Sequence, residues 1–268
     1  MQPLAVSPRI GKAIEAQVLS WGTVRAWPEQ LATWRKQPDP MPPEPVTPST
    51  LKHSEEQSVA GLWAVCEAIA GIEPKGMRFT DWGVIAAPRF CGRTANSLSS
   101  QRFLKEGAWG VSPNVIPHQS MHAVSGTISQ VLKIHGPNFG VGNGWSATSE
   151  GWLLAATMLS EGYLPGLWFV ITGHTGEYFP EGPDSPASRL ECEAVAFALV
   201  PKRGTQSGLY VRICPEEASI RDPENDPFLG SMPAFSLSQL VDELRRPDGS
   251  PAAMWRLPGA GWVEVEMR

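Results

Sequence analysis

Two residues near the middle of the chain have the types that acyl-transfer chemistry needs. Ser146 lies in Gly144-Trp145-Ser146, a tight turn between an expected strand and an expected helix, and His174 follows the next strand. Such a turn exposes a side chain beside the free N–H groups of a helix N-terminus, which stabilise an anion. The sequence Gly-Trp-Ser-Ala-Thr is close to the GxSxG pattern of hydrolases but does not match it. Ser146 is therefore either a nucleophile with His174 as its base or the cap of the helix that it precedes.

The other histidines and the cysteines give little reason to expect a metal site. His118 and His122 have the i, i+4 spacing of one helix face, but no Glu lies between them and no third ligand is evident. A structural or interface pair is the alternative. The cysteines form no CxxC pair and are far apart, at Cys66, Cys91, Cys192 and Cys214. We expect buried free thiols and neither a metal nor another cofactor.

The turn at Trp145 lies within a helix–strand–helix–strand unit that spans residues 112–173. The apolar pattern predicts a helix over 118–134, a short strand over 139–143, a helix over 147–161 and an apolar strand over 167–171. Two strands joined by a helix give a right-handed crossover in a parallel sheet. His174 would then lie at the carboxyl end of a strand, which is where clefts form in such sheets.

This unit resembles the β-ketoacyl synthases, the condensing enzymes of fatty acid and polyketide synthesis, which have the thiolase fold. The matching features are Ala123-Val124-Ser125-Gly126, Gly136-Pro137-Asn138, a strand, and a helix that ends at Gly162. In the family, Gly-Pro-Asn leads through a strand to a Thr-Ala-Cys-Ser turn. An ungapped count from Gly136 puts Trp145 at the position of the family's catalytic cysteine. An indole cannot carry an acyl thioester.

A complete condensing enzyme has two similar halves, and the second supplies its catalytic histidines, or His and Asn. This chain resembles the first half alone, over about residues 18–213, and closely only over 112–173. The resemblance implies an α/β, thiolase-like fold, one half of the condensing-enzyme fold, with a mixed, mostly parallel sheet between helices. We expect a domain over residues 1–215, with a proline-rich arm at 37–50, and a C-terminal extension over 216–268 packed on it.

The resemblance also implies a partner, because in the family the strand after Gly-Pro-Asn pairs antiparallel with its copy in a second subunit. Chain-length factors of type II polyketide systems, including the aryl polyene type, are similar in lacking the cysteine. This chain would then be a non-catalytic subunit that pairs with a full-length ketosynthase, works on chains held by an acyl carrier protein, and limits the acyl tunnel with Trp145. The implied partner interface consists of His118, Met121, His122, Ser125, Phe139, Gly140, Val141 and Gly142.

Two other functions are compatible with the same residues. One is an acyl-thioester-processing enzyme, for acyl transfer or decarboxylation, that uses Ser146 and His174. The other is a homodimeric protein that binds an acyl ligand or an acyl carrier protein.

Bulk properties agree with a globular protein. The chain has 268 residues, 42% of them hydrophobic, and a formal net charge of -5. This composition supports a sizeable core and gives no reason to expect nucleic acid binding. The N-terminal sequence MQPLAVSPRIGK lacks the apolar core of a signal peptide, and no apolar run is long enough to span a bilayer. We therefore expect a cytoplasmic protein.

Further elements are predicted on both sides of the central unit. Ser54 and Gln57 have the spacing of a capping box for a helix that ends at Gly71, and Ser236 with Gln239 caps a short helix. The remaining predictions are strands over 18–24, 81–87, 193–200, 209–213 and 262–267, the last as an edge strand, and helices over 27–34 and 94–106.

Overall fold

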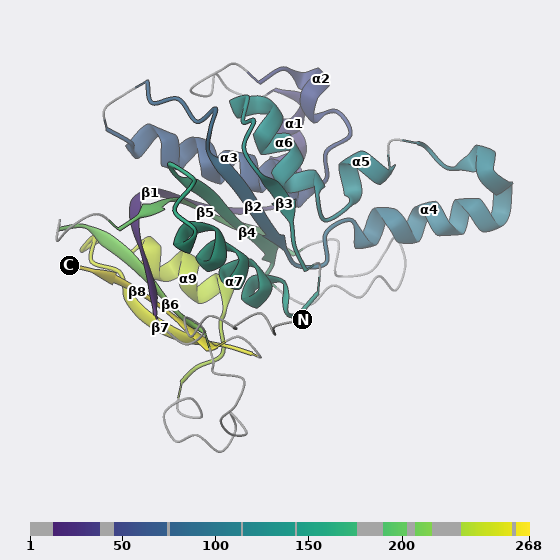
Figure 1. The fold of residues 1–268 in the computed structure, drawn as a ribbon. Coiled ribbons are helices and arrows are strands. Elements are labelled where there is room, and N and C mark those ends of the chain that lie inside the picture. Colours follow the sequence, from purple (N-terminus) through teal and green to yellow (C-terminus); the bar gives the residue numbers. More distant parts are fainter. Residues whose placement is uncertain are drawn as a thin grey trace, which may run out of the picture.

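The chain folds around a mixed sheet of eight strands (Figure 1). The computed structural model describes residues 13–37, 46–73, 76–113, 115–142, 144–175, 190–202, 207–215, 232–258 and 261–268. Its strands are β1 (Ile14–Ala26), β2 (Gly83–Pro88), β3 (Asn138–Gly140), β4 (Leu167–His174), β5 (Cys192–Pro201), β6 (Leu209–Pro215), β7 (Ala252–Leu257) and β8 (Gly261–Met267). Across the sheet they follow the order β3-β2-β4-β5-β1-β6-β8-β7.

Helices connect these strands and cover both faces of the sheet (Figure 1). The described helices are α1 (Pro28–Lys36), α2 (Pro48–Leu51), α3 (Glu56–Gly71), α4 (Arg93–Glu106), the 3-10 helix η1 (Gly107–Gly110), α5 (Val115–Gln119), α6 (Ala123–Leu132), α7 (Ala147–Ser160) and α9 (Leu237–Leu244). One core contains the buried side chains of α1, α3 and α6, and a second contains those of α7 and α9. The result is a sheet between two helical layers.

Strand β4 explains why the run of apolar residues after Gly166 is continuous. Successive side chains of a strand point to opposite faces of the sheet. Trp168 and Val170 therefore belong to the core under α3 and α6, whereas Phe169 and Ile171 belong to the core under α7. Both faces of the strand are dry, which confirms the prediction of a doubly covered strand.

The sheet is mixed, but the parallel part is smaller than predicted. Strand β2 pairs in parallel with β3 and with β4, while the other described pairings are antiparallel. Parallel neighbours need a crossover connection. The helices α4 to α6 supply it between β2 and β3, and the chain then returns through α7 to β4 on the other side of β2. The remaining neighbours are not joined in this way.

At the other end of the sheet, one expectation about strand position changes. The predicted edge strand is β8, but β7 lies outside it and pairs with it along its length. The strands β5 and β6 do not pair with each other, because β1 lies between them. Strands β7 and β8 continue the same sheet as β1 and β6.

Two helix starts also differ from the sequence prediction. The N-terminal cap of α3 is Glu55, whose side chain accepts a hydrogen bond from the Gln57 amide, and not Ser54. The predicted helix over 118–134 is broken into α5 and α6 by a turn at residues 120–122, where the Ala123 N–H donates to the Ser120 carbonyl. The break allows the Met121 backbone to pass close to β3. The cap of α9, Ser236 with the Gln239 amide, is as predicted.

The cysteines and the helix lengths bear on two further predictions. Cys66, Cys91 and Cys192 are buried free thiols, as predicted, and Cys214 is half-buried. None of the helices in the described ranges has the length and apolar character needed to cross a membrane.

Trp152 of α7 is expected to contribute strongly to stability. Its indole is fully buried against Phe169 and Phe197 of the central strands. Replacing a buried Trp by Ala costs about 3–5 kcal/mol. We therefore predict that Trp152→Ala lowers the free energy of unfolding by that amount in urea titrations. The matched control is Trp109→Ala, because Trp109 is fully exposed, and its unfolding should be unchanged; equal effects of the two substitutions would contradict the packing of α7.

Candidate functional site

The turn between β3 and α7 carries Trp145 and Ser146. Ser146 is the N-terminal cap residue of α7, but its side chain makes no capping hydrogen bond. Its hydroxyl donates to the Glu150 carboxylate at 2.5 Å. A serine nucleophile needs a base that accepts its proton and is itself held in place. Here the hydroxyl is directed along the helix surface, to a carboxylate one turn later.

Trp145 lies on the surface beside the turn that follows β2. Its ring meets the Phe90 ring edge-on, with centroids 5.4 Å apart, and the Arg89 guanidinium lies 5.0 Å from the indole centroid. Edge-to-face and cation–π contacts of this kind each stabilise a ring by about 0.5–1.5 kcal/mol. The indole is nevertheless 64% exposed. It is oriented by two neighbours and is open to further contact on the remaining side.

The turn from Arg89 to Gly92 is held by a half-buried residue, Glu55, that the sequence motifs did not reveal. Phe90 and Gly92 have positive φ angles of 54° and 71°. The Glu55 carboxylate accepts hydrogen bonds from the Cys91 thiol at 3.3 Å and from the Gly92 amide at 3.5 Å, besides that from the α3 terminus. Burial raises the pKa of Glu55 to about 7, and the neighbouring Glu56 adds to the effect. Glu55 thus links the start of α3 to the turn on which Trp145 packs.

His174 lies where the sequence predicted, at the carboxyl end of β4, opposite Cys192 of β5. Burial lowers the pKa of its imidazole, and the charge of Glu56 offsets part of this effect. A neutral imidazole is a suitable base. The Ser146 hydroxyl donates to Glu150 instead, so the structure does not supply the serine–histidine contact that the enzymatic alternative requires.

The spacing of His118 and His122 does not place them on one helix face, because α5 ends before α6 begins. The His118 ring lies 5.6 Å from the ring of His53, and Nδ1 of His122 lies 3.2 Å from the Ser125 hydroxyl. Across the described residues, no group of three or more His, Cys, Asp and Glu side chains has the geometry of a metal site.

Strand β3 forms one edge of the sheet, and four of the eight residues expected at a partner interface, Phe139 to Gly142, lie in it or directly after it. Phe139 and Met121 are exposed, and Val141 is half-buried. The turn before α6 packs on the strand so closely that a Cβ at Gly140 would lie 2.2 Å from the Met121 carbonyl oxygen. At Gly142, with φ of 81°, a Cβ would lie 2.2 Å from Cα of Ala147. Both glycines are therefore required by packing within this chain.

Ser125 is a correction to the expected interface. It is fully buried, and its hydroxyl donates to the His122 carbonyl inside the chain. The family resemblance placed it on the face that meets a partner, but in α6 its side chain is enclosed within the chain and contacts His122. It cannot contact a partner.

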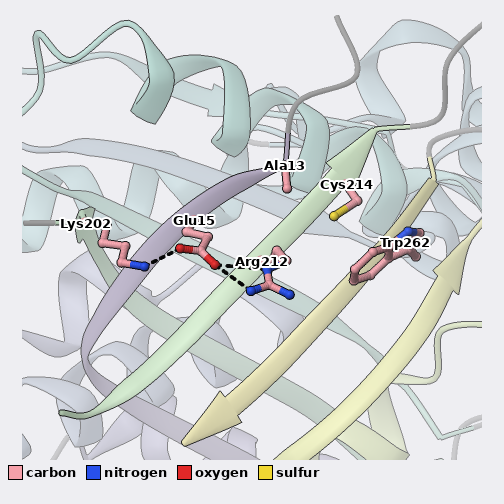
Figure 2. Close-up of a pocket in the computed structure, with 6 residues that line it drawn as sticks. All are labelled: Ala13, Glu15, Lys202, Arg212, Cys214 and Trp262. Atoms are coloured by element: carbon pink, nitrogen blue, oxygen red, sulfur yellow. Dashed lines mark hydrogen bonds and ion pairs between the residues drawn. The ribbon is translucent and has the colours of Figure 1, made fainter. Parts of the chain in front are cut away.

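An open depression of about 570 Å³ lies elsewhere, over β1, β6 and β8 (Figure 2). Glu15 occupies its centre and is paired with Lys202, Arg212 and Arg268. Hydrogen bonds from these cations lower the pKa of Glu15 to about 2. The remaining lining residues are Ala13, Cys214 and Trp262. Because its charges neutralise each other and none of the predicted site residues lies there, the depression is a structural ion-pair cluster.

No protein-family model matches the sequence, and a search of curated proteins found no match. Solved structures match the fold. A chain from the complex of a ketosynthase with its chain length factor, from Xenorhabdus doucetiae, aligns with a TM-score of 0.52 and 15% identity over 95% of this chain and 100% of its own length. This is the ketosynthase-like fold.

Two further solved structures are similar to this chain. A β-ketoacyl synthase from Burkholderia phymatum STM815 aligns with a TM-score of 0.51 and 13% identity over 88% of this chain and 70% of its own length. The ishigamide ketosynthase/chain length factor aligns with a TM-score of 0.49 and 14% identity over 75% of this chain. The chain spans 65% of the length of that protein. At these identities the matches establish the fold and leave the activity to be argued from the site.

The carboxylate of Glu55 makes stability depend on pH. Its pKa is about 7 in the folded chain, against an ordinary value of 4.5, so the folded state holds the proton more tightly between these values. The free energy of unfolding should therefore fall as pH rises from about 4.5 to 7. We predict that Glu55→Gln gains stability relative to wild type over this range, by about 1–3 kcal/mol at pH 8.

Urea unfolding at pH 5 and pH 8 measures this difference. The exposed carboxylate variant Glu106→Gln is the control, and its pH profile should follow that of the wild type. If the Glu55→Gln profile also runs parallel to the wild type, the raised pKa is wrong.

Proposed function

We propose that this chain is a non-catalytic, ketosynthase-like subunit that pairs with a full-length ketosynthase and shapes its acyl tunnel. The main support for this proposal is Trp145 in the turn before α7, at the position where the family resemblance puts the catalytic cysteine. An indole there cannot form a thioester, and it is exposed enough to meet a second subunit. The chemistry of the complex would belong to the partner.

Another thiol near the turn does not replace the missing one. Cys91 follows Phe90, which contacts Trp145, but it is almost completely buried. Burial and the Glu55 carboxylate raise the pKa of its thiol well above the ordinary value. The thiolate is the reactive form, so a buried thiol of raised pKa is a poor nucleophile. This supports a subunit that has no acyl-enzyme chemistry of its own.

The backbone at the two edges of the sheet differs, and this difference supports pairing at β3. The edge at β7 is protected, because the Phe235 amide donates to the Arg256 carbonyl, the Arg256 amide donates to the Pro233 carbonyl, and Glu243 accepts the Ala252 amide. Within the described ranges, no residue pairs with the outer edge of β3. The β3 edge therefore still offers unpaired N–H and C=O groups to another strand.

The Xenorhabdus doucetiae structure supports the choice of partner. It holds a ketosynthase together with its chain length factor, and the present chain aligns with the full length of one of its chains. A subunit of this size can therefore share the fold without the second half of a condensing enzyme. An acyl carrier protein is the further partner that the proposed role needs, because it delivers the growing chain.

Trp145 is suited to limiting a tunnel. Arg89 and Phe90 hold the indole from one side, so it presents a rigid surface rather than a flexible side chain. Large-to-small substitution at such a position opens space equal to the lost ring. The alternative mechanism through Ser146 and His174 gains no support, because the hydroxyl donates to Glu150.

Removal of the indole should lengthen the product. In a reconstituted complex of the chain, a full-length ketosynthase and its acyl carrier protein, Trp145→Ala should give products at least one extension cycle longer than wild type. Trp145→Phe keeps an aromatic ring and should shift the product less. Mass spectrometry of the carrier-bound products reads the length, and an unchanged product distribution for Trp145→Ala would exclude the tunnel role.

The chain alone should not become acylated. We predict no mass increase of the purified subunit after incubation with an acyl thioester or with a covalent condensing-enzyme inhibitor, whereas the full-length ketosynthase is labelled in a parallel reaction. A label on wild type that disappears in Ser146→Ala would instead favour the acyl-transferring enzyme. A label that persists in Ser146→Ala would also contradict the proposal and would place the reactive group elsewhere.

A further inference from the structure

Helix α4 and η1 form an arm that extends away from the sheet (Figure 1). The arm comprises Arg93–Gly110, and among its described side chains, which begin at residue 96, none is buried. Among the described elements, its main contacts are with α5, in addition to those between α4 and η1 themselves. A helix of globular proteins normally buries one face. Within the described part of the chain, this helix has no buried face.

The sequence of α4 does not explain how it could be stable by itself. It spans 14 residues, RTANSLSSQRFLKE, of which many are Ser, Thr or Asn with modest helix propensity. Isolated helices shorter than about 12–15 residues are marginal in water even when rich in Ala. The Gly92 cap adds no side-chain hydrogen bond. The arm therefore needs support from a surface outside this chain.

Apolar side chains on the arm indicate what kind of surface that is. Leu104 is 85% exposed and Trp109 is 100% exposed, and Leu98 and Phe103 are also exposed. A cluster of large apolar side chains in water marks an interaction site. Arg102 and Lys105 are exposed beside them, and neither makes an ion pair with any described residue. The complementary surface is therefore apolar and bordered by carboxylates.

Strand β3 is too short to hold a partner by itself, so a partner that pairs with it would also need to contact the arm. Its three residues span about 10 Å, which allows only a few hydrogen bonds to a neighbouring strand. A stable interface buries about 800 Å² on each partner. Strand pairing at β3 is too small by itself, whereas Trp and Phe side chains each bury about 150–250 Å². The arm is continuous with this edge through α5 and α6.

We infer that the arm packs on the same partner subunit that pairs with β3, and that α4 becomes firmly helical only in that complex. The inference rests on the proposed function, since the partner is taken to be a full-length ketosynthase. Leu104 and Trp109 insert into an apolar surface of that subunit. Arg102 and Lys105 meet acidic side chains at its border.

Affinity measurements on arm variants test the inference. The full-length ketosynthase encoded nearest to this chain in the same genome is the probe, and binding is followed by size-exclusion chromatography with light scattering and by titration. The double variant Leu104→Ser, Trp109→Ser should bind at least tenfold more weakly than wild type, because large apolar anchors dominate interfaces. Tyr163→Ser, at another exposed aromatic side chain, should bind like wild type.

Amide hydrogen exchange supplies a second measurement that does not depend on a variant. Amides of residues 96–106 should exchange rapidly in the isolated chain and at least tenfold more slowly in the complex. Protection of α4 in the isolated chain to the level of α3 would overturn the inference.

Circular dichroism and thermal unfolding of the double variant Leu104→Ser, Trp109→Ser should match wild type, since both side chains are exposed.

The outcomes separate this inference from the proposed function. If wild type binds the ketosynthase and the double variant binds equally well, the arm is not at the interface, and the proposed function stands. If wild type does not bind the ketosynthase, the proposed function and the inference both fail. If isolated wild type is a dimer that the double variant makes monomeric, the arm binds a second copy, which overturns its assignment to a ketosynthase.

Discussion

The parallel pairing of β2 with β4 positions the turn after β2, which carries Arg89 and Phe90, the two residues that contact Trp145. The register runs from Gly83 opposite Leu167 to Pro88 opposite Thr172, and the Arg89 amide then donates to the Thr172 carbonyl at 2.8 Å. Buried Gln57 of α3 completes the junction, because its amide nitrogen donates to the Arg89 carbonyl and its oxygen accepts from the Thr172 hydroxyl. Without this junction, the turn that carries Phe90 would have no fixed place.

The same junction brings the Glu55 carboxylate close to the start of α3 and to the turn after β2. The Glu55 carboxylate would be costly to bury without its hydrogen bonds to the α3 terminus and to the turn after β2. Because these bonds connect two elements, the carboxylate fixes the approach of α3 to the turn. The indole of Trp145 thus rests on a platform built from three segments that are distant in sequence. A rigid platform is what a side chain needs if its size is to limit a neighbouring cavity.

The two edges of the sheet differ: the backbone of β7 is hydrogen-bonded within the chain, and no described residue pairs with the outer edge of β3. This difference supports a partner at β3. A short segment at residues 233–235 and the side chain of Glu243 satisfy the backbone at β7. At β3, no described residue pairs with the outer backbone edge, and the Phe139 side chain is exposed there. A monomer gains nothing from such exposure, since unpaired edges and apolar surface favour association. The open edge, Trp145 and the arm are connected along the chain, which is the expected arrangement for one contact surface.

The sequence by itself determined the helices and strands that depend on residues close together in the chain. Apolar periodicity gave α3 and α7, continuous hydrophobicity gave β4, and Ser236 gave the start of α9, because these features depend on local backbone and burial on one or two faces. The placement of Trp145 at the position of the family's cysteine needed only the order of residues around Gly136, and it stays a prediction.

Tertiary structure decided the features that depend on contacts between distant segments. The close approach of β3 to Met121 split one predicted helix in two and turned Ser125 inward, and β7 displaced β8 from the edge. Glu55 became a cap and a support for the turn only because folding brings α3 beside Cys91 and Gly92. The sequence also predicted α4, but that its described side chains stay unburied could be known only after the other elements were in place.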